Sequence, residues 1–186
     1  MATSSVEICN SALIKVGAER ISALNESNVR ARLCNEQYDK KRRNLLRQHP
    51  WNFAMDRATL AADVTDPEWG YTYRYPLAST ILRVLQIEAD EPYEIEGRYI
   101  LTDAATVKIK YTKDITDTTL FDKNFEEALA SDIAADIAFA LTKNATLTKQ
   151  LKDEARLRLR EARSFDAQEG NPESTIEVDE WITSRF

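Results

Sequence analysis

Glycine and histidine are scarce in this 186-residue chain, which holds four glycines and one histidine. Gly17, Gly70, Gly97 and Gly170 stand too far apart for the glycine-rich loops that bind phosphates or dinucleotides. The single histidine, His49, excludes an HExxH motif and any metal site built from several histidines. We therefore expect the protein to use no cofactor and no metal ion.

Cysteine is also rare, and the two that are present, Cys9 and Cys34, lack CxxC spacing. Both fall in predicted helices, where a buried, small and apolar role is commoner than a disulfide or a metal site. Spacing alone leaves open a nucleophilic pair between a cysteine and His49. However, His49 directly precedes Pro50 at the end of a predicted helix, where a capping or packing role is the more usual one.

Paired acidic residues offer the one other candidate for acid–base chemistry. Asp132 and Asp136 lie four residues apart on a predicted helix and could form a carboxylate pair or hold a divalent ion. The same spacing fits a polar stripe opposite the apolar face that contains Phe125, Leu129 and Ile137. No second pair accompanies them, and we expect a protein that is not an enzyme.

Long apolar runs are missing as well. No stretch approaches the roughly 18 apolar residues of a membrane span. The opening residues, MATSSVEICN, have neither the cationic start nor the apolar segment of a secretion signal. We expect a protein that is made in the cytoplasm and has no membrane partner.

Charge is unevenly distributed along the chain, although the net charge is only −6. Residues 27–50 hold seven cations against two acids, a net of +5, and residues 164–186 hold six acids against one cation, a net of −5. The basic segment supplies six candidate interface residues: Arg30, Lys40, Lys41, Arg42, Arg43 and Arg47. The net negative charge argues against a general nucleic-acid binder.

Apolar periodicity predicts four helices, over residues 4–17, 27–49, 122–143 and 146–165. Ser4 and Glu7 have the spacing of a capping box, Gly17 marks the end of the first helix, and Pro50 ends the second. Between the helix pairs, residues 51–115 contain six short segments rich in Tyr, Ile, Val and Thr, which are typical of antiparallel strands: NFAMDRATLA, YTYRYPL, TILRVLQIE, YEIEG, RYILT and TVKIKYT.

The predicted fold is mainly α with a β insertion (α+β). The N- and C-terminal helix pairs form a four-helix bundle because neither pair can bury its apolar stripe alone, and a small antiparallel sheet is inserted between them. This domain covers residues 1–166, and residues 167–186 are expected to form an extended C-terminal arm. The arm carries apolar side chains of the kind that anchor interfaces, namely Ile176, Val178, Trp181, Ile182 and Phe186.

The basic run from Lys40 to Arg43 has two interpretations. It could contact nucleic-acid phosphates, or it could be a solvated or protein-contacting part of the helix. Four successive helical residues point around more than one full turn, so they do not form one face. The run also lacks interleaved aromatic residues for base stacking.

An ordered set of segments from Val6 to Phe165 resembles a known family. The segments include "ICNSALIKVGAERISALNE", "RLCNEQYDKKRRNLLRQHPWNFA" followed by "RATLA", "YTYRYPLASTILRVLQI", and the run from "YEIEGRYILT" to "LFDKNFEEALASDIAADIAFALT". Together they resemble the head-to-tail adaptor proteins of tailed phages, in particular the tail tubular protein A family of short-tailed phages. No single motif carries the resemblance; the order of the set does.

This resemblance implies a structural role in the neck of a virion. Such a protein forms a ring, usually of twelve copies, docked beneath the portal protein of the DNA-filled head, and presents its far side to the tail or nozzle protein. Packaged DNA passes through the lumen without sequence-specific binding. The stretch around Pro50 is then a structural joint, with Trp51 and Phe53 anchoring the sheet to the bundle from one face of a strand. A nucleic-acid-binding module that uses the basic second helix is the alternative.

Overall fold

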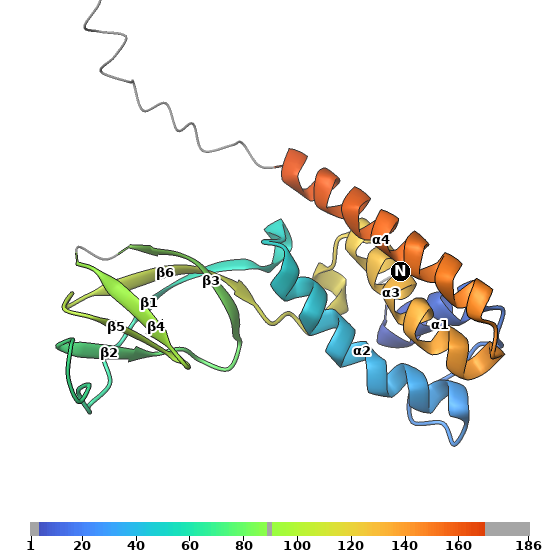
Figure 1. The fold of residues 1–186 in the computed structure, drawn as a ribbon, viewed down its shortest axis with the longest axis horizontal. Coiled ribbons are helices and arrows are strands. Elements are labelled where there is room, and N and C mark those ends of the chain that lie inside the picture. Colours follow the sequence, from blue (N-terminus) through green and yellow to red (C-terminus); the bar gives the residue numbers. More distant parts are fainter. Residues whose placement is uncertain (1–3, 89–90, 170–186) are drawn as a thin grey trace, which may run out of the picture.

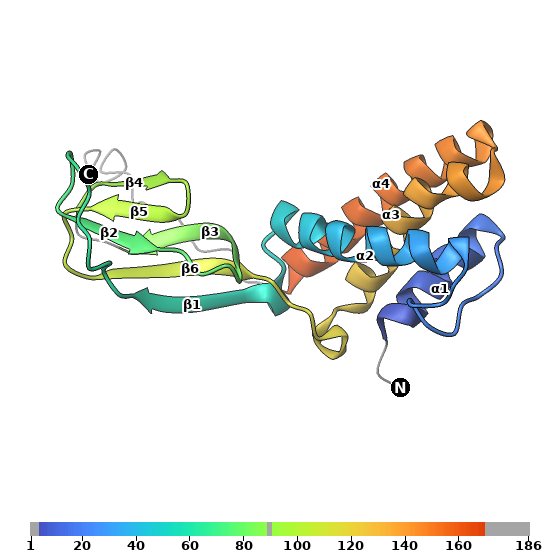
Figure 2. The same cartoon turned by 90° about the horizontal axis from the view of Figure 1, so that it is seen from below.

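The structure is a computed structural model that describes residues 4–88 and 91–169. It contains four helices, α1 (Ser5–Val16), α2 (Val29–Gln48), α3 (Lys123–Thr142) and α4 (Ala145–Gln168), with six strands between α2 and α3. The predicted α+β fold is therefore confirmed, with the strands inserted between two helix pairs. Figures 1 and 2 show the helices gathered at one end of the molecule and the strands at the other.

The helices begin and end where the local sequence directs. Ser4 and Glu7 form the predicted capping box at the start of α1, and Gly17 ends this helix in the left-handed conformation at φ 78°. The side chains of Asn28 and Asp122 accept backbone hydrogen bonds at the starts of α2 and α3. The fourth helix runs through Gln168, three residues beyond its predicted end, so the predicted boundary at residue 166 lies inside it.

The helices pack into one body, which we call the helical body, with α3 in contact with each of the other three. Alanines along α3 allow this close approach, and the larger side chains of its core include Phe125, Leu129, Ile133 and Ile137. Cys9 and Cys34 lie in the same core as free thiols, as predicted. Contact with the Cys34 side chain, together with burial, raises the pKa of Cys9 and so disfavours its thiolate.

All six predicted strand segments form strands: β1 (Met55–Leu60), β2 (Tyr73–Pro76), β3 (Ile81–Glu88), β4 (Tyr93–Glu96), β5 (Tyr99–Thr102) and β6 (Val107–Lys113). They build two antiparallel sheets instead of the single one predicted. Sheet A has the order β1-β6-β3, and sheet B has the order β2-β5-β4. We call the two sheets together the β module.

The two sheets share a second, smaller core. Tyr75 and Ile100 from sheet B and Val107, Ile109 and Tyr111 from sheet A are buried between them. The Tyr75 hydroxyl donates a 2.7 Å hydrogen bond to the Ala104 carbonyl, which satisfies its buried polar group. The β module thus has a core of its own, and it meets the helical body at the two chain passages and where α2 contacts β3. None of the helices in the described part of the chain is long and apolar enough to cross a membrane.

Candidate functional site: the joint between the helical body and the β module

The chain passes between the two bodies twice, and we call these two passages the joint (residues 49–54 and 114–121). The first passage follows α2 and includes the short 3₁₀ helix Asn52–Ala54. The second follows β6 and includes the 3₁₀ helix Thr118–Leu120 before α3 begins. Figure 2 shows β1 and β6 side by side as they leave the joint, so the two passages are neighbours in space.

Aromatic side chains fill the joint. Trp51 is fully buried, and its Nε1 donates a 2.9 Å hydrogen bond to the carbonyl of Leu45 in α2. The Trp51 ring lies edge-on to the ring of Phe125 in α3, with 5.1 Å between their centroids. The centroid of the Phe53 ring lies 5.0 Å from that of Phe125. Phe121 completes the cluster from the second passage. Both passages are therefore packed on the first turn of α3.

The backbone at Trp51 and Phe53 differs from the prediction. The two residues were expected to share one face of a strand, but residues 52–54 form a 3₁₀ turn, and the strand starts at Met55. Within this turn, the backbone N–H of Asn52 donates a hydrogen bond to Asp166. The tight turn still directs both aromatic rings toward Phe125, which is the contact that the strand interpretation had implied.

Asp166, near the end of α4, holds the first passage. It is 7% exposed, and its Oδ1 accepts a 2.9 Å hydrogen bond from the backbone N–H of Asn52. Its Oδ2 lies 2.9 Å from His49 Nε2, which therefore carries the hydrogen because a carboxylate only accepts. The Asn52 amide in turn donates to the Asp166 carbonyl at 2.6 Å. The single histidine thus forms a structural hydrogen bond, and it does not contact Cys9 or Cys34.

Sequence reasoning missed Asp166 because the fourth helix was predicted to end at residue 165. The signal was present in the periodicity of α4. Leu159 and Ala162 lie on the inward face of this helix, and a step of four from Ala162 reaches Asp166. An acid at an inward-facing position of a helix needs a polar partner, and the single histidine at the end of the second helix could have been considered as that partner.

Cations of α2 hold the second passage and the start of β3. Arg42 is 3% exposed; its guanidinium contacts the carboxylate of Asp114 and the carbonyl of Ile115, and lies 3.2 Å from Asp39. Arg43 Nε lies 3.1 Å from the other oxygen of Asp114. The guanidinium of Arg47 donates to the Leu82 carbonyl of β3.

The prediction that Arg42 is a surface charge at a subunit or portal contact is therefore corrected. Its side chain is buried and faces Asp114, because position 42 lies on the apolar face of α2, four residues after Tyr38 and three before Leu45. Arg43 and Arg47 remain exposed, but Arg43 binds Asp114 of the joint and Arg47 binds β3. Three of the six basic candidates thus connect α2 to the second passage of the joint or to the β module within one chain.

The other three basic candidates lie elsewhere on the helical body. Lys41 bridges Asp132 at 3.2 Å and Asp136 at 2.7 Å, so the two candidate carboxylates of α3 share a cation. Burial raises the pKa of Asp132, while the contact with Lys41 opposes this rise. Arg30 lies 3.1 Å from Glu19. Lys40 is exposed and makes no ion pair with any acid in residues 4–88 or 91–169.

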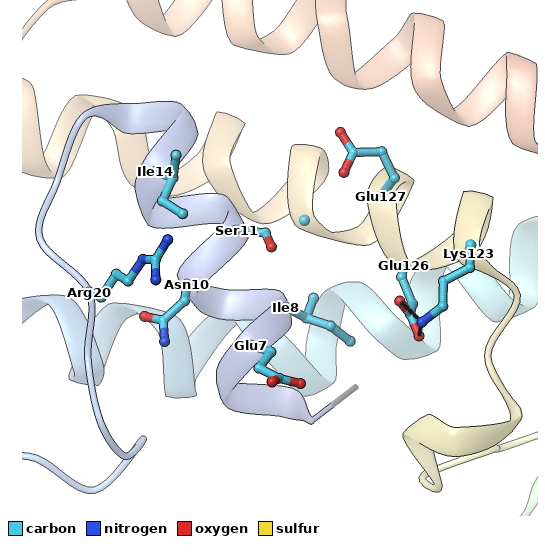
Figure 3. Close-up of a pocket in the computed structure, with 10 residues that line it drawn as sticks. Glu7, Ile8, Asn10, Ser11, Ile14, Arg20, Lys123, Glu126 and Glu127 are labelled. Carbon is cyan, nitrogen blue, oxygen red and sulfur yellow. Dashed lines mark hydrogen bonds and ion pairs between the residues drawn. The ribbon is translucent and has the colours of Figure 1, made fainter. Parts of the chain in front are cut away.

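A hollow lies away from the joint, between α1 and the start of α3 (Figure 3). It measures about 510 Å³ and is open to solvent. Two of its polar side chains are engaged in the fold: Asn10 binds both backbone groups of Ile21, and Glu127 lies 2.7 Å from Lys15. The hollow is lined by Glu7, Ile8, Asn10, Ser11, Ile14, Arg20, Lys123, Glu126, Glu127 and Ala130. These groups do not form a nucleophile–base arrangement.

Among the described residues, no group of three or more His, Cys, Asp or Glu side chains could hold a metal ion. The candidate interface residues of the arm, Ile176, Val178, Trp181, Ile182 and Phe186, lie outside the described residues. No model of a protein family matches the chain, and no curated protein matches it either. Compared with the hollow and with the ion pairs of Lys41 and Arg30, the joint is the most extensively bonded feature, with buried groups from α2, α3 and α4.

Proposed function

We propose that this protein is a structural head-to-tail adaptor of a tailed phage. Copies of the chain, twelve by analogy with the resembled family, form a ring in the neck of the virion. The ring binds the portal protein on one side and a tail or nozzle protein on the other, and continues the channel through which packaged DNA passes. The proposal assigns the protein no catalytic step.

The doubly held joint is the observation that supports this proposal best. An adaptor has to keep two binding surfaces, at opposite ends of one chain, in a fixed relation. Here Asp166 holds the first passage and Arg42 holds the second, with an aromatic cluster between them. A buried polar network of this kind favours one arrangement of the two bodies over others.

The use of the basic cations also fits an adaptor better than a nucleic-acid-binding module. A module that binds DNA through α2 needs these cations free to contact phosphates. Arg42 and Arg43 instead contact Asp114 of the joint, Arg47 contacts β3, and Lys41 contacts α3. Four of the seven cations in residues 27–50 are thereby bound within the chain.

Electron microscopy of the purified chain mixed with the portal protein of the same phage tests the proposal. We expect rings of the chain stacked on the portal, together with weak binding of duplex DNA at physiological salt. Tight DNA binding that falls steeply with salt, without any association with the portal, would favour the nucleic-acid-binding module.

The arm gives a second test of the same proposal. We expect that deletion from Ser174 onward will abolish stable attachment to the portal, because the deletion removes five apolar anchor residues. Co-sedimentation with the portal measures the attachment. A matched variant, Thr183→Ala with Ser184→Ala, keeps all five anchors and should attach normally. Full attachment of the truncated chain would refute a role for the arm.

A further inference from the structure

The outer face of sheet A carries an unusual arrangement of charge. Arg57 of β1 is directly opposite Lys110 of β6, and Thr59 is directly opposite Lys108. Like charges at directly opposite positions on neighbouring strands are destabilising. Along this face runs a shallow hollow of about 370 Å³, lined by Arg57, Ala58, Thr59, Gln86, Glu88, Lys108, Ile109 and Lys110.

This cationic pair is not neutralised by the acids that the structure describes. Two other cations of the β module pair with acids: Arg74 lies 3.0 Å from Asp63, and Lys113 lies 3.1 Å from Asp56. On the outer face of sheet A, Lys108 reaches Glu88 at 3.2 Å. The side chains of Arg57 and Lys110 pair with none of the acids in residues 4–88 and 91–169, so an anionic group placed over them would relieve their repulsion.

The same face ends at an open edge. Strand β1 pairs only with β6, so its other side presents unpaired backbone N–H and C=O groups within the described fold. On the inner side of β1, Ala58 and Leu60 are half-buried at the border of the second core. A strand added along β1 would therefore gain backbone hydrogen bonds, apolar contacts on one side and cations on the other.

The C-terminal arm contains a segment with the matching pattern. In residues 175–179, TIEVD, the apolar Ile176 and Val178 alternate with the acidic Glu177 and Asp179. Successive side chains of a strand point to opposite faces, so the two acids would share one face and the two apolar residues the other. If the apolar face meets Ala58 and Leu60, the carboxylates lie on the side of Arg57 and Lys110.

The arm also starts close enough to reach this edge. The Asp166 carboxylate binds the backbone of Asn52, three residues before β1 begins, and Figure 2 shows the last turn of α4 beside the start of β1. Residues 170–175 can span about 20 Å when extended, at roughly 3.3 Å per residue. Attachment to the same chain also gives the segment a high effective concentration at β1.

We propose that residues 175–179 of the chain's own C-terminal arm pair with β1 as an added strand of sheet A, with Glu177 and Asp179 facing Arg57 and Lys110. The surface takes an acidic, strand-forming peptide in preference to nucleic acid. Only three cations line the hollow, Glu88 lies among them, and none of the lining residues is aromatic. The inference does not depend on the proposed role as an adaptor.

Hydrogen exchange on the full-length chain, without a portal, tests this inference. We expect the amides of residues 175–179 to exchange at least tenfold more slowly than those of an unstructured peptide of the same sequence. Reversal of the cations, Arg57→Glu with Lys110→Glu, should remove this protection. Reversal of the acids, Glu177→Lys with Asp179→Lys, should also remove it, and the combination of all four changes should restore it.

The controls separate this inference from its alternatives. Lys40→Glu reverses an exposed cation on α2 and should leave the protection unchanged. Protection that is lost on hundredfold dilution would overturn the proposal in favour of the arm of a second copy. Unprotected residues 175–179, or a duplex DNA that binds through Arg57 and Lys110, would overturn it as well. Because no portal is present, these results are independent of whether the chain attaches to a portal.

Discussion

Replacement of Arg42 with alanine will lower the free energy of unfolding by about 3–5 kcal/mol, the loss typical of removing one partner from a buried ion pair. The guanidinium is almost fully buried and contacts Asp114, Asp39 and the Ile115 carbonyl. Without it, Asp114 keeps only the exposed Arg43 as a cationic partner, and the buried carbonyl of Ile115 loses its side-chain donor. Urea denaturation measures this effect directly.

A neighbouring cation supplies the matched control for this experiment. Lys40→Ala removes a charge from the same basic run, but Lys40 is exposed and unpaired within the described residues, so the change should stay within about 0.5 kcal/mol. A loss below about 1 kcal/mol for Arg42→Ala would show that the second passage of the joint does not depend on this cation.

A double substitution tests whether the pair acts as a unit. Arg42→Met together with Asp114→Leu removes both charges and keeps apolar volume in the site. Because replacement of both partners avoids an unpaired buried charge, the double variant should be more stable than Arg42→Met alone. This order of stabilities is specific to an ion pair, since two independent packing losses would add.

Much of the fold followed from periodicity, because the signals involved are local. Caps, apolar steps of three and four, and alternating β-branched and aromatic residues identified all four helices and all six strands. The division of the strands into two sheets was not predictable in this way. It depends on which strands pair, and β1 pairs with β6, about fifty residues later in the chain.

The buried position of Arg42 could not be recognised from the basic run, but it could be recognised from the helical periodicity of α2. Read as a run, residues 40–43 are four equivalent cations. Read as a helix, position 42 continues the apolar series Ala31, Cys34, Tyr38 and Leu45, which marks it as inward-facing. Its partner Asp114 is 72 residues away, and no local pattern identifies such a contact. The helix face was predictable, and the ion pair was not.

Trp51→Ala should also destabilise the chain by about 3–5 kcal/mol, the usual cost of truncating a buried aromatic residue. The indole is fully buried at the point where α2, α3 and the first passage of the joint meet. It also donates to the Leu45 carbonyl in the last turn of α2, where the helix itself offers no further donor. Trp51→Phe keeps part of the packing but loses this hydrogen bond, so an intermediate loss is expected.

Trp69→Ala is the matched control, because Trp69 is 87% exposed at the far end of the β module and should contribute little to stability. The comparison separates a packing role from a binding role for Trp51. If Trp51→Ala remained as stable as the unaltered chain and lost only attachment to a partner, Trp51 would belong to an interface. A shared loss of stability in Trp51→Ala and Arg42→Ala would instead mean that both passages of the joint are part of one cooperative unit, because failure of either would then unfold the chain.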